Sequence, residues 1–230
     1  MTKGITVGIF LRLALNTSQY ESQAISPIAV GEKRIKDYEN GLTRLRVILK
    51  EFAKTPIFIV DNTLEDLTQI PLELKSLIPE NWIVVLTHSN IYGRHNKGAG
   101  DIETIRCISQ ILTTFDYVIF YEPRLILEKT HILTSLIQSP RNALWLENKN
   151  FYDFILRRKS KSVSFGFYSI QPEKLLSFVD QVDLERMVDR KESVEDIFFD
   201  FLKKEGSINI KRWGWHSLRR EVSTDSYQKY

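Results

Sequence analysis

The stretch Pro56-Ile57-Phe58-Ile59-Val60-Asp61-Asn62 indicates the fold most clearly. Its apolar centre, from Ile57 to Val60, is rich in β-branched and aromatic residues and predicts a buried β-strand. Asp and Asn favour turns, so Asp61-Asn62 marks the end of that strand. Strands that are apolar along their whole length are typical of parallel sheets covered by helices on both faces.

Strands and helices alternate along the chain on both sides of this stretch. The apolar runs that predict further strands cover 5–14, 82–87 and 115–121. Apolar residues recur at helical spacing over 32–54, 67–77 and 101–112, with Asp101 as the expected N-cap of the last helix. The alternation predicts an α/β protein with a mostly parallel sheet between two helical layers, a three-layer sandwich.

The second half of the chain is less regular. It predicts helices over 130–138, 172–180 and 194–204, and strands over 143–146, 163–170 and 208–213. No linker or repeat divides the chain, so we expect one domain over residues 1–220, followed by a polar tail over 221–230 that frays.

Composition and charge narrow the classes of function. The 230 residues are 43% hydrophobic and 27% charged, as is ordinary for a globular protein, and the formal net charge is +3. That charge suits an anionic small ligand or at most a peripheral membrane contact, and it is far from the signature of a nucleic-acid-binding protein. The single cysteine excludes an internal disulfide. With no signal peptide and no apolar run of about 20 residues, we expect a cytoplasmic location.

Ligands of such sheets bind beyond the carboxyl ends of the strands, so the residues that follow each strand are the candidates for a site. These candidates are Asp61-Asn62, Asn96-Lys97-Gly98 at a helix start, Glu122-Pro123-Arg124, Glu195-Asp196 at another helix start, and His216. Glycines at a helix start let backbone N–H groups approach an anion, and Lys97 would add a positive charge.

Each candidate also has an ordinary structural interpretation, and the sequence leaves both open. Asp61-Asn62 would suit a turn, and the Asn96 segment a flexible loop. Glu195-Asp196 would suit the first turn of a helix, where acidic side chains are favourable. Glu122 could be a surface residue and His216 a structural one.

The order of these segments resembles the glycosyltransferases of the GT-A fold, over residues 5 to 216. The resemblance implies that Asp61 and Asn62 contact the nucleobase and ribose of a nucleotide-diphosphate sugar. It also implies that Asn96, Lys97 and Gly98 belong to the donor site. The acidic pair at the later helix start supplies the catalytic base, for which we expect Asp196, with Glu195 in a supporting polar role.

One segment departs from that pattern. The family carries an Asp-x-Asp motif that holds Mn²⁺ or Mg²⁺ and the diphosphate, whereas this chain has Glu122-Pro123-Arg124. Glu122 could still hold a metal, together with His216, since such ions need one or two carboxylates plus phosphate oxygens. Alternatively, Arg124 neutralises the leaving diphosphate directly, or the domain has lost activity.

The sequence therefore predicts a glycosyltransferase that acts on a glycan or lipid-linked acceptor, in glycan or cell-surface polysaccharide synthesis. A non-catalytic nucleotide-sugar-binding or assembly module of the same fold is the alternative, favoured by the incomplete motif. A dehydrogenase is disfavoured because Leu13-Ala14-Leu15-Asn16, and no Gly-x-Gly-x-x-Gly turn, follows the first strand.

Overall fold

A seven-stranded sheet forms the centre of the protein, as a computed structural model describes it. The model describes residues 4–16, 18, 32–127, 130–146, 164–205, 209–212 and 218–220. The strands of this sheet lie in the order β3-β2-β1-β4-β7-β6-β8. Their bounds are β1 Val7–Leu13, β2 Ile57–Asp61, β3 Ile83–Leu86, β4 Tyr117–Tyr121, β6 Ala143–Leu146, β7 Phe167–Ile170 and β8 Asn209–Arg212.

The predicted α/β class with a mostly parallel sheet is confirmed. Strands β3, β2, β1 and β4 run parallel to one another. Strand β7 is antiparallel to both of its neighbours, β4 and β6, and β8 is parallel to β6. The reversed strand β7 makes the second half less regular.

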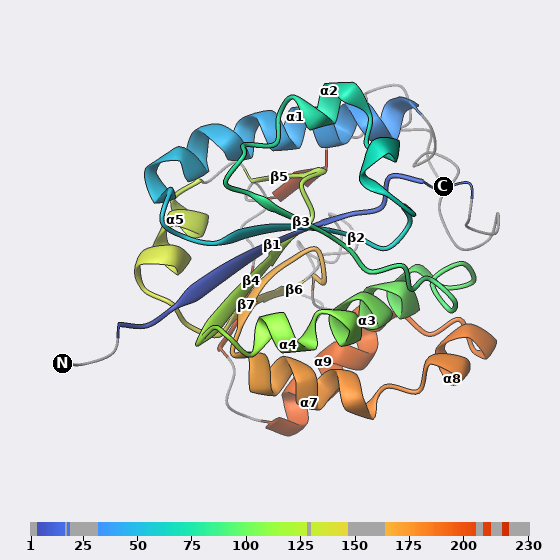
Figure 1. Ribbon diagram of the computed structural model, residues 1–230. Helices are drawn as coiled ribbons and strands as arrows, with labels where there is room; N and C mark the ends of the chain where they lie inside the picture. The colour runs from blue at the N-terminus through green and yellow to red at the C-terminus, as the bar shows by residue number, and fades with distance from the viewer. Residues whose placement is uncertain are drawn as a thin grey trace.

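Helices cover both faces of the sheet, so the protein has three layers (Figure 1). Helices α1, α2 and α5 lie on one face, and α3, α4, α7, α8 and α9 on the other. Their bounds are α1 Glu32–Leu49, α2 Leu72–Lys75, α3 Lys97–Cys107, α4 Ser109–Leu112, α5 His131–Gln138, α7 Pro172–Gln181, α8 Leu184–Asp189 and α9 Val194–Glu205. Short 3-10 turns, η3 Lys50–Phe52 and η4 Leu67–Gln69, complete the first face.

The sheet separates two apolar cores because successive side chains of a strand point to opposite faces. All seven residues of β1 are buried, as expected for a strand at the centre of the sheet. On the face of the sheet that α3 covers, aromatic rings from four neighbouring strands stack in a row. The ring centroids are 4.8 Å apart for Phe58 and Phe10, 5.3 Å for Phe10 and Phe120, and 5.1 Å for Phe120 and Tyr168. Such cross-strand pairs stabilise both the sheet and its register.

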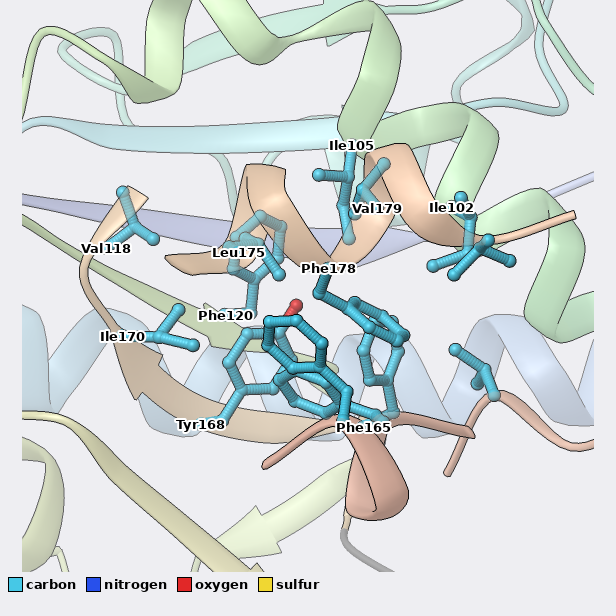
Figure 2. Close-up of a cluster of buried hydrophobic side chains, with 14 of the residues drawn as sticks. Ile102, Ile105, Val118, Phe120, Phe165, Tyr168, Ile170, Leu175, Phe178 and Val179 are labelled. Atoms are coloured by element: carbon cyan, nitrogen blue, oxygen red, sulfur yellow. The ribbon is translucent and has the colours of Figure 1, made fainter. Parts of the chain in front are cut away.

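Phe178 of α7 and Phe165, which precedes β7, close this core from the helical side (Figure 2). The opposite face packs against α1 through Tyr38, Leu42 and Leu45. The core that contains Phe165 comes close to the carboxyl ends of β1 and β4, so it supports the side chains at that edge.

Most of the expected elements are present, and one of them begins elsewhere. We expected Asp101 to cap a helix, but α3 begins at Lys97 and its N-cap is Asn96, whose side chain accepts hydrogen bonds from the N–H groups of Gly98 and Ala99. Asp101 therefore lies inside the helix. Helix α8 and a separate two-stranded sheet of β5 (Leu125–Leu127) and β9 (Leu218–Arg220) were not predicted.

The predicted single domain over 1–220 stays a prediction, and the tail over 221–230 lies outside the described residues. Within the described ranges, no helix is both long and apolar enough to cross a membrane.

Candidate functional site

A small charged cavity lies at the carboxyl edge of the sheet. Strands β1, β2 and β4 end there, and β7 begins there because Phe167 pairs with Tyr121. The cavity has a volume of about 20 Å³, which is room for about one water molecule. The charged side chains among its lining residues are Arg12, Arg34, Lys97, Asp101 and Glu122.

Arg12 and Asp101 form a buried ion pair in this cavity. Arg12 points from β1 toward the face of α3 and is only 6% exposed. Its Nη1 lies 2.9 Å from Oδ1 of Asp101, and its Nη2 donates a hydrogen bond of 2.5 Å to the carbonyl oxygen of Phe165. The guanidinium carbon also lies 5.0 Å from the ring centroid of Phe165. These contacts hold Arg12 in one orientation.

Burial raises the pKa of Asp101, while the charges of Arg12 and Lys97 act in the opposite direction. Glu122 and Glu195 are near enough to raise it further.

The sequence analysis did not identify Arg12 or Asp101 as site residues. The available signal was a cation inside the apolar run Ile9-Phe10-Leu11-Arg12-Leu13, since an arginine is almost never buried without a partner.

Glu122 is 5% exposed, and two cations surround it. Its Oε1 forms an ion pair with Arg124 and lies 3.6 Å from Nζ of Lys97. Backbone contacts fix its position: the N–H of Glu122 donates to the carbonyl oxygen of Gly166 over 2.7 Å. A Cβ at Gly41 of α1 would lie 1.8 Å from the carbonyl oxygen of Pro123, so α1 touches this segment directly.

The ring of Tyr38 in α1 lies against two cations, Arg34 and Arg124. Its ring centroid lies 5.5 Å from the guanidinium carbon of Arg34 and 5.4 Å from that of Arg124. Its hydroxyl accepts hydrogen bonds from the N–H of Ala14 and from Arg34. Arg12, Arg34, Lys97 and Arg124 thus lie among the carboxylates Asp101 and Glu122, and Glu195 and Asp37 are near enough to act on Asp101 and Arg124.

Asp61 is 1% exposed, and its carboxylate accepts four hydrogen bonds from the chain itself. Oδ1 accepts from Thr63 N, Thr63 Oγ1 and Leu64 N, which is the geometry of a turn, and Oδ2 accepts from Leu15 N over 2.9 Å. Asp61 therefore fixes the turn after β2 to the start of the segment that follows β1.

Asn62 and Asn96 also connect segments of the chain. Asn62 Nδ2 donates to Asn90 Oδ1 and to the carbonyl oxygen of Gly100. Asn96 Nδ2 donates to the carbonyl oxygens of Met187 and Glu192, so the start of α3 is tied to the segment before α9.

Gly98 allows α3 and α9 to meet closely at their N-termini. A Cβ at this position would lie 2.9 Å from Cβ of Val194, the first residue of α9. Any larger residue would push the two helix ends apart.

A second, larger cavity of about 370 Å³ lies beside these helix ends. It shares Lys97 and Asp101 with the charged cavity, and Glu195 is also among its lining residues. Glu195 Oε2 accepts a hydrogen bond of 2.6 Å from Ser193 Oγ. Asp196, the expected base, is not among the described residues that line this cavity.

The described side chains around Glu122 do not form a divalent-metal site by themselves. No cluster of three or more His, Cys, Asp or Glu residues occurs among the residues that the structure describes, so an ion there would depend on phosphate oxygens for most of its ligands. The ion pairs of Glu122 with Arg124 and Lys97 also oppose a further cation there. His216, the other expected ligand, lies outside the described residues.

Solved structures of other proteins share the fold of this chain. A protein of Desulfovibrio desulfuricans G20 assigned to the nucleotide-diphospho-sugar transferases matches with a TM-score of 0.51 and 8% identity, over 91% of this chain and 80% of its own. The chain has the GT-A fold. No family model matches the sequence, and no curated protein matches it.

Two weaker matches are to a galactosyltransferase and a xylosyltransferase. The catalytic domain of Drosophila β1,4-galactosyltransferase 7 matches with a TM-score of 0.45 and 11% identity, over 91% of this chain and 65% of that one. Mouse xyloside xylosyltransferase 1 matches with a TM-score of 0.44 and 9% identity, over 91% of this chain and 84% of that one. At these identities the likeness concerns the fold, so the function depends on the site itself.

Proposed function

We propose that the protein is a glycosyltransferase, which moves a sugar from a nucleotide-diphosphate sugar to an acceptor hydroxyl. The single observation that carries this proposal is the cluster of charged side chains at the carboxyl edge of a GT-A-like sheet, where the cations Arg12, Arg34 and Lys97 meet the carboxylates Asp101 and Glu122. A diphosphate is the anionic part of such a donor, and arginine forks match phosphate oxygens.

Arg124 and Lys97 would bind the diphosphate in place of a metal ion. Both lie against the buried carboxylate of Glu122, which holds them in position before the donor arrives. As the bond between the anomeric carbon and the diphosphate oxygen breaks, the electron pair leaves with the nucleoside diphosphate. Fixed cations near that oxygen would stabilise the developing charge without reorganisation.

Asp61 and Asn62 would act in nucleotide binding by shaping the wall for the base and ribose. Asp61 fixes Leu15, and so would position the segment after β1 over the nucleotide. Gly98 would let the start of α3 lie close to the donor, and Asn96 would hold that helix end in place.

Glu195 is the better candidate for the general base, and Asp196 the supporting residue. Glu195 borders the larger cavity together with Lys97 and Asp101, and that cavity has room for an acceptor sugar. The base would take the proton of the acceptor hydroxyl as its oxygen bonds to the anomeric carbon. The acceptor would be a glycan or a lipid-linked sugar of polysaccharide synthesis.

A non-catalytic nucleotide-sugar-binding module remains the second candidate. The observation in its favour is that Arg124, itself 8% exposed, pairs with the only carboxylate of the Glu122-Pro123-Arg124 segment. Incubation with UDP-, GDP- and CDP-sugars, with EDTA or Mn²⁺, distinguishes the two functions. Slow hydrolysis or transfer of one donor supports the enzyme, binding without turnover supports the module, and binding of none contradicts both.

A further inference from the structure

Strand β3 forms one edge of the central sheet, and none of the described residues pairs with its outer side. The N–H of Thr87, just after β3, donates inward to the carbonyl oxygen of Asp61 over 3.0 Å. Because main-chain groups alternate in direction along a strand, those of Val84 and Leu86 point outward.

Edge strands usually carry a feature that prevents pairing, such as a lysine, a proline or a bulge. Strand β3 has the sequence Ile83-Val84-Val85-Leu86, with no charge and no proline, and Ile83 is 49% exposed. Within the described ranges, the strand therefore offers unpaired main-chain groups on an apolar surface.

Two hollows of opposite charge lie at the two ends of this strand. The hollow at its start has a volume of about 520 Å³ and is lined by Arg46, Lys50 and the exposed Val47, with no Asp or Glu among its described lining residues. The hollow at its end has a volume of about 560 Å³. It is lined by Glu65 and Asp66, together with apolar side chains such as Leu67, and by no described Lys or Arg.

We propose that a second copy of this chain pairs with β3 in an antiparallel, two-fold-symmetric dimer. With the axis at Val85, Val84 of one copy lies opposite Leu86 of the other, and their outward main-chain groups form hydrogen bonds. The start of each strand then faces the end of its partner, so the basic hollow of each copy meets the acidic hollow of the other.

The charge arrangement is what favours a second copy over an unrelated partner strand. A two-fold interface uses the same patch twice, and it must therefore be complementary to itself. A basic patch at one end of the strand and an acidic patch at the other meet this condition only in the antiparallel arrangement. That pairing would join the two central sheets into one continuous sheet.

Charge reversal tests this interface by sedimentation equilibrium across a wide range of protein concentration. Arg46→Glu and Glu65→Arg each create a like-charge contact at both ends of the interface. We expect each to raise the dimer dissociation constant by about tenfold or more, which corresponds to about 1.4 kcal/mol. The double variant, Arg46→Glu with Glu65→Arg, reverses both charges and is expected to restore most of the lost affinity.

Lys204→Glu is the matched control, because Lys204 is exposed at the end of α9 and has no part in this surface. It should dimerise like the unchanged protein. Neither Arg46 nor Glu65 lines the charged cavity or the larger cavity of the candidate site. Circular dichroism of each variant checks its folding without reference to activity. A monomer at all concentrations, or a dimer whose affinity neither reversal changes, would overturn the proposal.

Discussion

At the scale of single residues, the site consists of buried charges that hold one another in place. Arg12 is paired with Asp101, and Glu122 with Arg124, and each of these four side chains is buried or nearly so. Removing one partner of such a pair leaves the other charge unpaired, which typically costs about 3–5 kcal/mol. The site is therefore organised before any ligand binds, and its charges respond to pH and to mutation in defined ways.

Asp101 should make stability depend on pH in one direction. Its pKa is raised in the folded protein. At pH values between the ordinary pKa and the raised one, the carboxyl group is therefore ionised in the unfolded chain but still protonated in the folded protein. The contribution of Asp101 to the free energy of unfolding is thus most favourable below the ordinary value and falls as pH rises through the raised pKa. Asp101→Asn does not titrate at this position, so the free energy of unfolding in urea of the unchanged protein, minus that of Asp101→Asn, should decrease as pH rises over this window. A difference that grows instead would mean that the pKa is lowered.

Glu195 and Asp196 can be separated by their amide variants. If Glu195 is the base, Glu195→Gln should slow transfer by about a hundredfold or more while the affinity for the donor stays the same. Asp196→Asn should keep most of the activity, because Asp196 does not line the cavity that would hold the acceptor. Initial rates with saturating donor, together with donor titrations, give both quantities. The reverse ranking of the two variants would return the role to Asp196.

At the scale of helices and strands, close packing positions the Glu122-Pro123-Arg124 segment. Helix α1 approaches the carbonyl oxygen of Pro123 so closely that position 41 admits only a glycine. The same helix carries Arg34 and Tyr38, which border Arg124 and the charged cavity. A shift of α1 would therefore move three parts of the candidate site together.

Gly41→Ala tests this coupling. The added methyl group forces α1 and the segment apart, and we expect a loss of stability of about 1–3 kcal/mol, as for other overpacked positions. Affinity for a nucleotide sugar should fall as well, since Arg124 moves with the segment. Gly4→Ala is the control, because a Cβ at position 4 meets nothing within 4 Å. Equal behaviour of the two variants in thermal unfolding and donor titration would show that the approach of α1 is unimportant.

The sequence predicted the strands well because they are continuous apolar runs, and the long helices well because their apolar residues recur at helical spacing. It misplaced the start of α3, since Asn96 and Asp101 are both good N-caps and only the tertiary contacts of Asn96 with Met187 and Glu192 favour the earlier one. It could not give the reversed direction of β7, because an apolar strand has the same pattern in either direction. The pairing of Arg12 with Asp101 depends on how α3 packs against β1, which no local pattern contains.

At the scale of the whole molecule, the GT-A sheet brings residues from distant parts of the chain to one edge. The charged cavity and the larger cavity share Lys97 and Asp101, so under the proposed function the donor's diphosphate would lie against the charged residues that border the larger cavity. Under the proposed function, cations fixed by carboxylates would take the place that the Asp-x-Asp motif of GT-A glycosyltransferases gives to a metal ion. The central claim is that this cation-rich edge binds the diphosphate of a nucleotide sugar without a divalent metal.

Calorimetric titration of the protein with UDP-, GDP- and CDP-sugars, in EDTA and again in Mn²⁺, tests that claim most directly. The account predicts that one donor binds with the same affinity in both buffers, and that Arg124→Ala weakens its binding by about tenfold or more, since charge-assisted phosphate contacts are lost. Thermal unfolding of Arg124→Ala shows whether the variant is folded. Binding that requires Mn²⁺, or no binding of any donor, would contradict the account.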